Sequence, residues 1–597
     1  MEAPGAAARL DPLRPGEASR AARLFAWGAL ATILLVVYGR VLGYPFLRWD
    51  DTTAVTDNPF LSPPSWTNLG RVWSAPWAGL YVPASFTVLW IEARISALLG
   101  GGPDPRVFHL GVFLLHCACA GVVLHLLLRL VGDLRAAFLG ALLFAIHPLQ
   151  TESVAWITET RGVLATLFGL LALAVHVGGS PTMRRDVAAT ALFLLALLSK
   201  PSAVAVPVVA LLVDRFVLDR PLRRILPLLA VWCAMVLAVL LVTKSQQSGP
   251  TIRFEAPLVA RPLVAGDALA FYLEKLAWPF GLVADYGRKP AWLMQQPIFR
   301  FHWLVPVCLA AALACLPQRR TWLVAYALFV AGVLPVLGLV SFNFQDISTV
   351  GDRYVHLAML GPALALAAGI ARCRGPAALA LAATALVALA GISWRQAGFW
   401  RDTDVLFRRT FEVNDRSYIA CVHIGVGCAN AGRPDEAATW YERALALEPG
   451  YPVAAGNLGK IRLDRGDLDG AIELFRETVR GSPDYPYARQ DLAIALVQRG
   501  MRATGDARKR DWQEAETVLR ETVRMQPGFH GGHLTLGQLL FVTGRIEEAR
   551  SEFAQALDIL GTSADAHQGL ALCYEKLGDR ARAAEHAQAA ARLRGGG

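Results

Sequence analysis

Charged residues are scarce in this chain of 597 residues, at 18% against 54% hydrophobic residues. Soluble domains average roughly 25% charged residues, so the composition does not fit a soluble protein throughout. The shortage ends near residue 395. Before that point long apolar runs alternate with short Arg-rich loops, and after it the pattern is that of charged, amphipathic helices. We therefore expect an all-α protein with a membrane part followed by a soluble part.

Several motifs that would announce a particular chemistry are also missing. The nine cysteines form no CxxC pair and no Cys/His spacing typical of zinc sites. There is no glycine-rich phosphate loop, no HExxH motif and no Ser/His/Asp order. Cys421 and Cys428 lie on one predicted helix about 10 Å apart, too far for a disulfide. No metal-ligand set or resident cofactor is predicted, although a divalent metal stays compatible with the sequence.

The net charge of +10 does not indicate nucleic-acid binding, because no basic patch is interleaved with aromatic residues. Many arginines instead occupy short loops between apolar runs, as expected beside a membrane. Lysine is scarce relative to arginine, which is typical of GC-rich coding and favours a bacterium. The expected location is thus the bacterial plasma membrane, or the endoplasmic reticulum membrane in a eukaryote.

Residues 24–394 are predicted to form the membrane domain. About eleven apolar segments are candidate spans, although several are shorter than the usual ~20 residues. They are 24–42, 107–128, 135–147, 162–178, 187–199, 201–217, 222–242, 302–316, 321–341, 355–371 and 377–394. The pair 187–199 and 201–217 could instead be a tilted hairpin or a re-entrant pair.

The arginine-rich loops predict the orientation of these spans. In the eleven-span arrangement five such loops fall on the side of the N-terminus, which identifies that side as cytoplasmic. They hold Arg129 and Arg135; Arg184 and Arg185; Arg215, Arg220, Arg223 and Arg224; Arg319 and Arg320; Arg372 and Arg374. Residues 1–23 begin like a signal peptide, but no small-residue cleavage site follows, so a cytoplasmic tail and an uncleaved anchor are predicted. An odd number of spans places the C-terminal part outside the cytoplasm.

Two long loops, 43–106 and 243–301, are expected on the extracytoplasmic side. The first contains an amphipathic stretch from Pro83 to Leu99. Glu92 and Arg94 make this stretch a poor span, so we expect it to lie along the membrane interface.

The soluble part repeats with a period of 34 residues. Equivalent pairs are Ala437 and Ala471, Tyr441 and Phe475, Pro449 and Pro483, Gly544 and Gly578, and Ala549 and Ala583. This pattern is typical of tetratricopeptide repeats, which stack helix pairs into an α-solenoid. Five repeats are predicted over 418–597, after a linker at 395–417. The interval from Pro483 to Pro527 is ten residues longer, and the excess is expected in a loop around Arg502–Arg510.

The adjacent carboxylates Asp50 and Asp51 follow the first span by eight residues. Acidic pairs beside a membrane are costly unless water, a metal or a reaction requires them. One of them could take the proton of an attacking hydroxyl as a general base. The alternative is a helix N-cap or a solvated pair in a loop, and the sequence does not say which of the two would be the base.

Other ionisable residues are expected on the same side of the membrane. In 147–152, His147 and Glu152 could position a substrate, or could simply mark the end of one helix and the start of another. Arg161 could bind a phosphate or only extend its charge to the interface. Lys200 lies where positive charge is least expected, which favours an anionic headgroup as its partner. Arg353 could bind a phosphate with two hydrogen bonds, or form an ordinary pair with Asp352.

Taken in chain order, these motifs resemble one family. They are Asp50-Asp51, Tyr81-Val82-Pro83, His147-Pro148-x-x-Thr151-Glu152-x-Val154, Leu198-Ser199-Lys200, Arg353-Tyr354 and Phe399-Trp400-Arg401-Asp402, followed by the repeats. The set is similar to the transmembrane and tetratricopeptide-repeat-containing O-mannosyltransferases, within the GT-C glycosyltransferases. One position departs from the pattern: Val82 stands where Tyr-Arg-Pro is expected, so a basic contact is either missing or supplied by Arg48 or Arg94.

The resemblance implies a polytopic GT-C membrane domain of about eleven spans. It also implies a polyprenyl-phosphate sugar donor, an acidic pair as catalytic centre, and transfer, with mannose as the expected sugar, to protein Ser or Thr. Asp50 or Asp51 would be the base, and Arg353, Lys200 and Arg161 would bind the donor phosphate. His147, Glu152 and Tyr354 would shape the pocket.

Two functions of other classes remain open. A membrane-anchored scaffold could use the repeats to assemble partner proteins, but it would not need the acidic pair. A transporter of a lipid-linked sugar would place its charges in the middle of spans rather than at their ends. In the enzyme interpretation, the repeats bind the acceptor protein or another partner protein.

Overall fold

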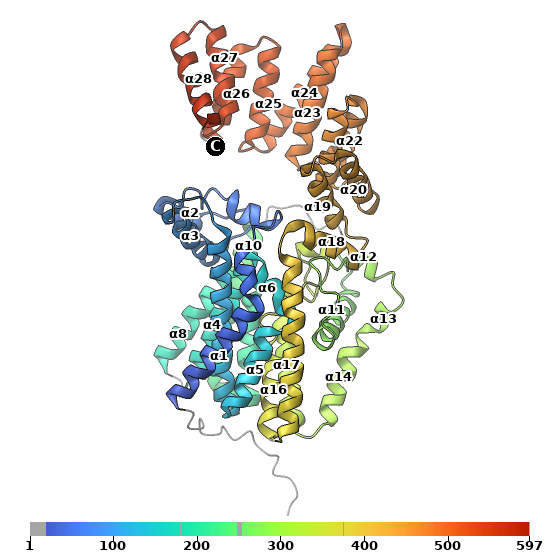
Figure 1. The fold of residues 1–597 in the computed structure, drawn as a ribbon. Helices are drawn as coiled ribbons and strands as arrows, with labels where there is room; N and C mark the ends of the chain where they lie inside the picture. The colour runs from blue at the N-terminus through green and yellow to red at the C-terminus, as the bar shows by residue number, and fades with distance from the viewer. Residues whose placement is uncertain (1–18, 180–181, 247–253, 374, 596–597) are drawn as a thin grey trace, which may run out of the picture. The chain divides into compact units, whose positions relative to one another are not determined.

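The computed structural model describes residues 19–179, 182–246, 254–373 and 375–595 (Figure 1). Within these ranges the chain is helical, and its only β-type pairing is an isolated bridge between Trp77 and Leu80. The predicted all-α class is confirmed. The chain divides into two compact units, Met1–Asp415 and Arg416–Gly597.

The first unit contains eighteen α-helices in its described residues. They are α1 Arg20–Tyr38, α2 Trp66–Ser74, α3 Pro83–Leu98, α4 Pro105–Val131, α5 Leu134–Ile146, α6 Thr151–Ala155, α7 Thr160–Val177, α8 Met183–Ser199, α9 Val206–Leu212, α10 Leu222–Gln246, α11 Arg261–Ala277, α12 Pro290–Leu293, α13 Phe299–His302, α14 Leu304–Cys315, α15 Arg319–Val333, α16 Leu360–Arg372, α17 Pro376–Ala397 and α18 Thr403–Val413.

Six helical segments among the described residues are long and apolar enough to cross a membrane. They are Arg20–Gly43, Pro105–Val131, Ile157–Val177, Leu222–Val242, Arg319–Val336 and Pro376–Trp400. A seventh results if Leu134–Ile146 and Pro148–Ala155, bent by 52°, form one span. This number is lower than the expected eleven because the remaining expected spans are short or interrupted. Helices α14 and α16 are too short, and α9 follows a 3-10 turn that begins at Pro201.

The membrane helices pack through small residues. Helix α5 contacts α4 and α16 (Figure 1). Helix α4 also contacts α7. At Gly140 of α5, a Cβ atom would lie 2.5 Å from the Ala363 carbonyl of α16. At Gly361 of α16, a Cβ atom would lie 2.3 Å from the Ala325 carbonyl of α15. Small residues of this kind allow helix backbones to approach closely in a membrane, where the hydrophobic effect does not drive helix association.

The loop 43–106 folds into a small layer of its own around α2 and α3. Phe86, Leu89 and Trp90 of α3 form a core cluster with Val55 and Val72. The opposite face of α3 exposes large apolar side chains, namely Ile91, Ile95 and Leu98. An exposed apolar face fits the expected position along the membrane interface, which remains a prediction.

Residues 395–417 were expected to be a linker, but most of them are helical. Helix α17 extends to Ala397, and α18 follows at Thr403–Val413. Helix α18 belongs to the first unit because Arg48 N donates to Thr403 Oγ1 at 2.9 Å and the Trp49 ring contacts Phe407. These contacts come from residues far apart in the sequence, so periodicity alone could not identify them.

Where it is described, the second unit contains ten helices in five antiparallel pairs. They are α19 Tyr418–Asn430, α20 Pro434–Leu447, α21 Pro452–Asp464, α22 Leu468–Gly481, α23 Pro486–Arg502, α24 Gly505–Met525, α25 His530–Val542, α26 Ile546–Ile559, α27 Ala564–Lys576 and α28 Arg580–Gly595. The repeated alanines Ala437 and Ala471 are fully buried, next to the buried rings of Tyr441 and Phe475. The α-solenoid prediction is confirmed.

The ten additional residues of the third repeat do not form a loop, contrary to expectation. They lengthen the two helices, since α23 continues to Arg502 and α24 begins at Gly505. Arg499 of α23 forms hydrogen bonds with Asp511 of α24 at 2.7 and 3.0 Å, and the Trp512 indole donates to Val497 O. These contacts between the extensions stabilise helix where the charged sequence suggested a solvated loop.

Candidate active site

The acidic pair is held at the end of α1 by a short chain segment. A 3-10 turn, Gly39–Gly43, ends the helix, and the chain then passes through Trp49. The Trp49 ring stacks on Trp156 with ring centroids 4.5 Å apart and an interplanar angle of 8°. Aromatic stacking of this kind anchors the segment that carries the two carboxylates.

Asp51 is buried and all its bonding is with protein. Its Oδ1 accepts from Thr158 N at 3.0 Å and from Thr158 Oγ1 at 2.6 Å, and its Oδ2 accepts from Leu47 N at 3.0 Å. Burial raises the pKa of this carboxyl to about 6, against the lowering effect of these hydrogen bonds. Asp51 therefore ties its own segment to the turn before α7.

Asp50 has the opposite environment. Its side chain is exposed, and within the described ranges no hydrogen bond to its carboxylate is recorded. Protein nevertheless surrounds it closely enough that burial raises the pKa of the carboxyl, while Arg161 and Arg353 oppose the rise. A carboxylate with free lone pairs and a raised pKa is suited to accept a proton from an incoming group.

Two buried ion pairs lie close to the acidic pair. Glu152 Oε1 is 2.5 Å from Arg353 Nη1, and Glu152 Oε2 accepts from the Arg353 backbone N at 3.1 Å. Lys200 Nζ donates to both oxygens of Glu159, at 2.8 and 3.1 Å. The two pairs adjoin, because Arg353 Nε lies 3.9 Å from Glu159. Each buried charge thus has a partner, as burial requires.

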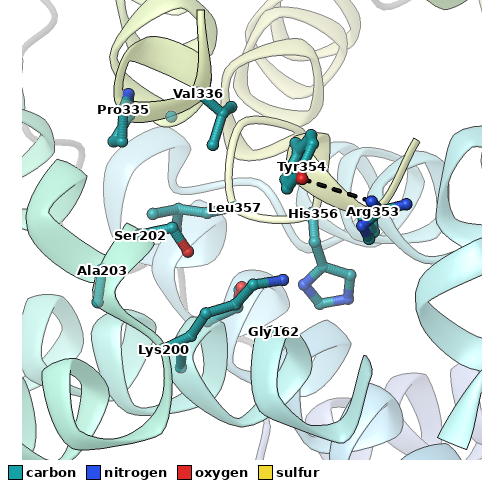
Figure 2. Close-up of a pocket in the computed structure, with 13 residues that line it drawn as sticks. Gly162, Lys200, Ser202, Ala203, Pro335, Val336, Arg353, Tyr354, His356 and Leu357 are labelled. Carbon is teal, nitrogen blue, oxygen red and sulfur yellow. Dashed lines mark hydrogen bonds between the residues drawn. The ribbon is translucent and has the colours of Figure 1, made fainter. Parts of the chain in front are cut away.

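Aromatic rings complete the surroundings of Arg353. The guanidinium carbon is 4.0 Å from the centre of the Phe344 ring and 4.8 Å from that of Tyr354. Arg353 Nη2 also donates to the Tyr354 hydroxyl at 3.4 Å (Figure 2). These contacts hold the guanidinium in one orientation, which favours binding of a planar or tetrahedral anion.

Arg161 differs from the other two cations. Its Nε donates to the Thr158 carbonyl at 3.1 Å, and its side chain is half-buried. Among the described residues no carboxylate is recorded within ion-pair distance of its guanidinium. Its terminal nitrogens are therefore the cationic donors of the site that are least occupied by protein.

A pocket opens between α7, the turn after α8 and the segment before α16. Its lining includes Lys200, Arg353, Tyr354 and His356 (Figure 2). Glu152 joins this group through its ion pair with Arg353. The structure therefore brings together four predicted residues, namely Glu152, Lys200, Arg353 and Tyr354. His147 makes other contacts: its Nε2 lies 3.1 Å from Leu276 O, and its Nδ1 accepts from Leu149 N at 3.3 Å.

Sequence reasoning missed Thr158, Glu159 and His356. Thr158 and Glu159 lie in residues 157–160, directly before Arg161, and polar residues ahead of an apolar helix were the signal that could have identified them. His356 gave no signal, because a single histidine in an apolar run is ordinary. Arg48 and Arg94, the suggested substitutes for the missing basic contact, are both exposed. In the described part of the chain no group of three or more His, Cys, Asp or Glu side chains could hold a metal ion.

Comparisons with known proteins identify the repeats of the second unit. A family model described as tetratricopeptide repeat matches residues 429–486 and 501–564. Among solved structures, a thermophilic TPR protein of Thermus thermophilus is 28% identical, with a TM-score of 0.26. That match covers 30% of this chain and 95% of the other.

Curated relatives extend the similarity into the membrane part. The mouse protein O-mannosyl-transferase TMTC3 is 21% identical over 589 residues, which cover 89% of this chain and 63% of the relative. Mouse TMTC2 is 30% identical over 207 residues, covering 32% of this chain and 24% of the relative. Human TMTC1 is 33% identical over 148 residues, covering 24% and 17%. The chain thus spans less than two thirds of the length of these relatives. The family resemblance seen in the motifs is confirmed.

Proposed function

Since this chain is similar to the TMTC protein O-mannosyl-transferases over 89% of its length, we propose that it is a membrane glycosyltransferase of the GT-C type. The proposed donor is a polyprenyl-phosphate sugar, with mannose as the sugar. The proposed acceptor is a Ser or Thr hydroxyl of a protein on the extracytoplasmic side. The proposal requires no resident cofactor, and a divalent metal remains open.

The observation that carries the proposal is the exposed carboxylate of Asp50 near Arg161 and Arg353. In the proposed reaction the acceptor hydroxyl oxygen attacks the anomeric carbon of the sugar. Asp50 takes the hydroxyl proton, and the bond from the anomeric carbon to the phosphate oxygen breaks. The polyprenyl phosphate leaves with one more negative charge, which nearby cations stabilise.

Arg161 is assigned to the donor phosphate because its terminal nitrogens have no recorded carboxylate partner among the described residues. Arg353 and Lys200 add positive potential, but Glu152 and Glu159 compensate much of it. The cluster is therefore near neutral without the donor. This balance lets the cations remain buried before the phosphate arrives.

The two other functions are less well supported by this arrangement. A scaffold would have no use for an unbonded carboxylate beside a buried network of ion pairs. A transporter is expected to carry its ionisable groups on interrupted helices near the middle of the membrane. Here the charged residues occupy short turns between helices: Asp50 precedes a π turn, Glu159 ends a 3-10 turn, and Arg353 lies in another.

A transfer assay tests the proposal directly. The purified full-length chain in detergent is incubated with polyprenyl-phosphate mannose and a Ser/Thr-containing peptide or protein. We expect a hexose to appear on the acceptor by mass spectrometry, together with free polyprenyl phosphate. Activity with a nucleotide sugar but not with the lipid-linked donor would contradict the donor assignment.

Topology is a separate prediction, which follows from the arginine-rich loops. A periplasmic reporter such as alkaline phosphatase should be active when fused after residue 597. The same reporter should be inactive when inserted just before α8, whose first turn carries Arg184 and Arg185. Equal activity at both positions would contradict the proposed extracytoplasmic location of the repeats.

The repeats are proposed to bind the acceptor protein or another partner protein, without taking part in the chemistry. Stacked helix pairs provide an extended concave surface, which is suited to holding a polypeptide. Truncation after Asp415, the last residue of the first unit, should preserve transfer to a short peptide and weaken transfer to a full-length protein. The rates with the two acceptors provide the measurement.

The control is a truncation after Asp402, which also removes α18. This shorter variant loses the Thr403 and Phe407 contacts to the segment that carries the acidic pair. It should lose transfer to the short peptide as well. If truncation after Asp415 abolishes peptide transfer while the membrane part stays folded, the repeats form part of the active site.

A further inference from the structure

His356 is a buried residue of the pocket that the proposed reaction has not used. It follows the turn that carries Arg353 and is 2% exposed. Its imidazole lies in the pocket near Lys200 (Figure 2). Its Nδ1 has no hydrogen-bond partner in the described structure, although it is buried. Buried polar atoms are almost always bonded, so an unbonded one in a pocket suggests a ligand.

A chain of hydrogen bonds determines where the protons of this imidazole lie. His116 Nε2 is 2.9 Å from the Ala145 carbonyl, and His116 Nδ1 is 3.1 Å from His356 Nε2. A carbonyl can only accept, so His116 must carry its proton on Nε2. In the neutral ring His116 Nδ1 is then an acceptor, and His356 Nε2 must donate to it.

The histidine pair is neutral because a further positive charge would be unfavourable there. Both rings are buried, and the nearby carboxylates Glu152 and Glu159 are already paired with Arg353 and Lys200. Burial without an anionic partner disfavours a charged imidazole. With its one proton on Nε2, His356 therefore presents a bare Nδ1 lone pair to the pocket.

A lone pair selects one kind of ligand group. The phosphate of the donor is a diester, so its oxygens carry negative charge and no proton at neutral pH, and this nitrogen repels them. A hydroxyl group can donate to it, and a sugar carries several hydroxyl groups. Thr166 and Ser202 also line the pocket, so further hydroxyl contacts are available beside His356.

We propose that His356 Nδ1 accepts a hydrogen bond from a hydroxyl of the donor sugar, which makes this pocket the sugar subsite. The inference rests on the proposed function, because it takes the ligand to be a lipid-linked sugar. His356 is then a specificity-determining residue. His116 is a positioning residue, because it acts only by fixing the proton of His356.

Binding measurements test this inference without requiring transfer. The probes are a short-chain polyprenyl phosphate, its mannosyl ester and a set of monodeoxy mannosyl esters. Calorimetry on the full-length protein in detergent gives the affinity of each. The mannosyl ester should bind at least about tenfold more tightly than the phosphate. One monodeoxy ester should bind about tenfold more weakly than the full mannosyl ester, because it leaves the buried acceptor unpaired.

Substitutions at His356 assign that loss to one atom. The variant His356→Leu removes the acceptor. Its affinity for the mannosyl ester should therefore fall about tenfold, while its affinity for the polyprenyl phosphate should not change. In His356→Asn the amide oxygen can take the place of Nδ1, so the advantage of the mannosyl ester should be retained. In His116→Leu the ring of His356 can hold its proton on either nitrogen. The mannosyl ester should then bind more tightly than the polyprenyl phosphate by a smaller factor than in wild type.

The outcomes separate this inference from the proposed function. If His356→Leu weakens both probes equally or neither of them, or if every monodeoxy ester binds wild type as tightly as the full ester, the inference is wrong. If His356→Leu does not fold, the monodeoxy series and His356→Asn still decide. A wild-type protein that shows the sugar-dependent affinity but transfers nothing would overturn the transferase function and leave the sugar subsite standing.

Discussion

Replacing Asp50 with asparagine is expected to lower sugar transfer by at least about 10²-fold, the usual size of a lost general base. The amide keeps the shape of the side chain but cannot take up the proton of the acceptor hydroxyl. Because no hydrogen bond to the Asp50 carboxylate is recorded in the described structure, the thermal unfolding midpoint should stay close to that of wild type. Transfer rate and unfolding midpoint, measured on the same preparation, give both results.

Asp51→Asn is the matched comparison, with the same chemistry one residue along the chain. Three donor groups from Leu47 and Thr158 converge on the Asp51 oxygens. An amide NH₂ would face at least one of these donors, which costs about 1–3 kcal/mol. This variant should therefore unfold at a lower temperature. Its transfer should recover partly on cooling, because a lower temperature stabilises the segment that carries the acidic pair.

If Asp50→Asn keeps full transfer, Asp50 is not the base. If Asp51→Asn loses transfer at an unchanged unfolding midpoint while Asp50→Asn keeps transfer, Asp51 is the base. Asp50→Glu offers a further check, since it keeps a carboxylate and displaces it by one methylene. It should retain more activity than Asp50→Asn.

The second large effect is expected from breaking the Glu152–Arg353 pair. In Glu152→Gln the amide can still accept from the Arg353 backbone, but the buried guanidinium loses its nearest negative charge. Removing one partner of a buried ion pair typically costs about 3–5 kcal/mol. The thermal unfolding midpoint should fall clearly, and transfer should fall because the orientation of Arg353 changes.

Two further variants isolate the cause. Glu152→Gln combined with Arg353→Met removes both charges, so part of the lost stability should return, whereas transfer should not. Glu473→Gln breaks the exposed pair between Arg480 and Glu473 in the repeats, and it should hardly change the unfolding midpoint. An unchanged midpoint in Glu152→Gln would mean that the pair does not contribute to the fold as the structure indicates.

Much of the architecture follows from local sequence patterns. Apolar runs and the 34-residue period predicted a helical membrane part and an α-solenoid, because each pattern reports which face of a helix is buried. The acidic pair and the residues Glu152, Lys200 and Arg353 were also identifiable, since charges at the ends of apolar segments are costly without a reason. Local patterns failed where contacts between helices override propensity, as in the extended helices α23 and α24.

The roles within the site depend on contacts between distant residues. Asp50 and Asp51 are neighbours of the same type, and only the hydrogen bonds from Thr158, 107 positions away, make one of them structural and leave the other unbonded within the described ranges. The acceptor role proposed for His356 depends on the contact of its ring with His116, 240 positions away. The sequence by itself determined which residue types and which helices are present. The tertiary structure decided which polar atoms remain unpaired, because that depends on donors and acceptors that no local pattern records.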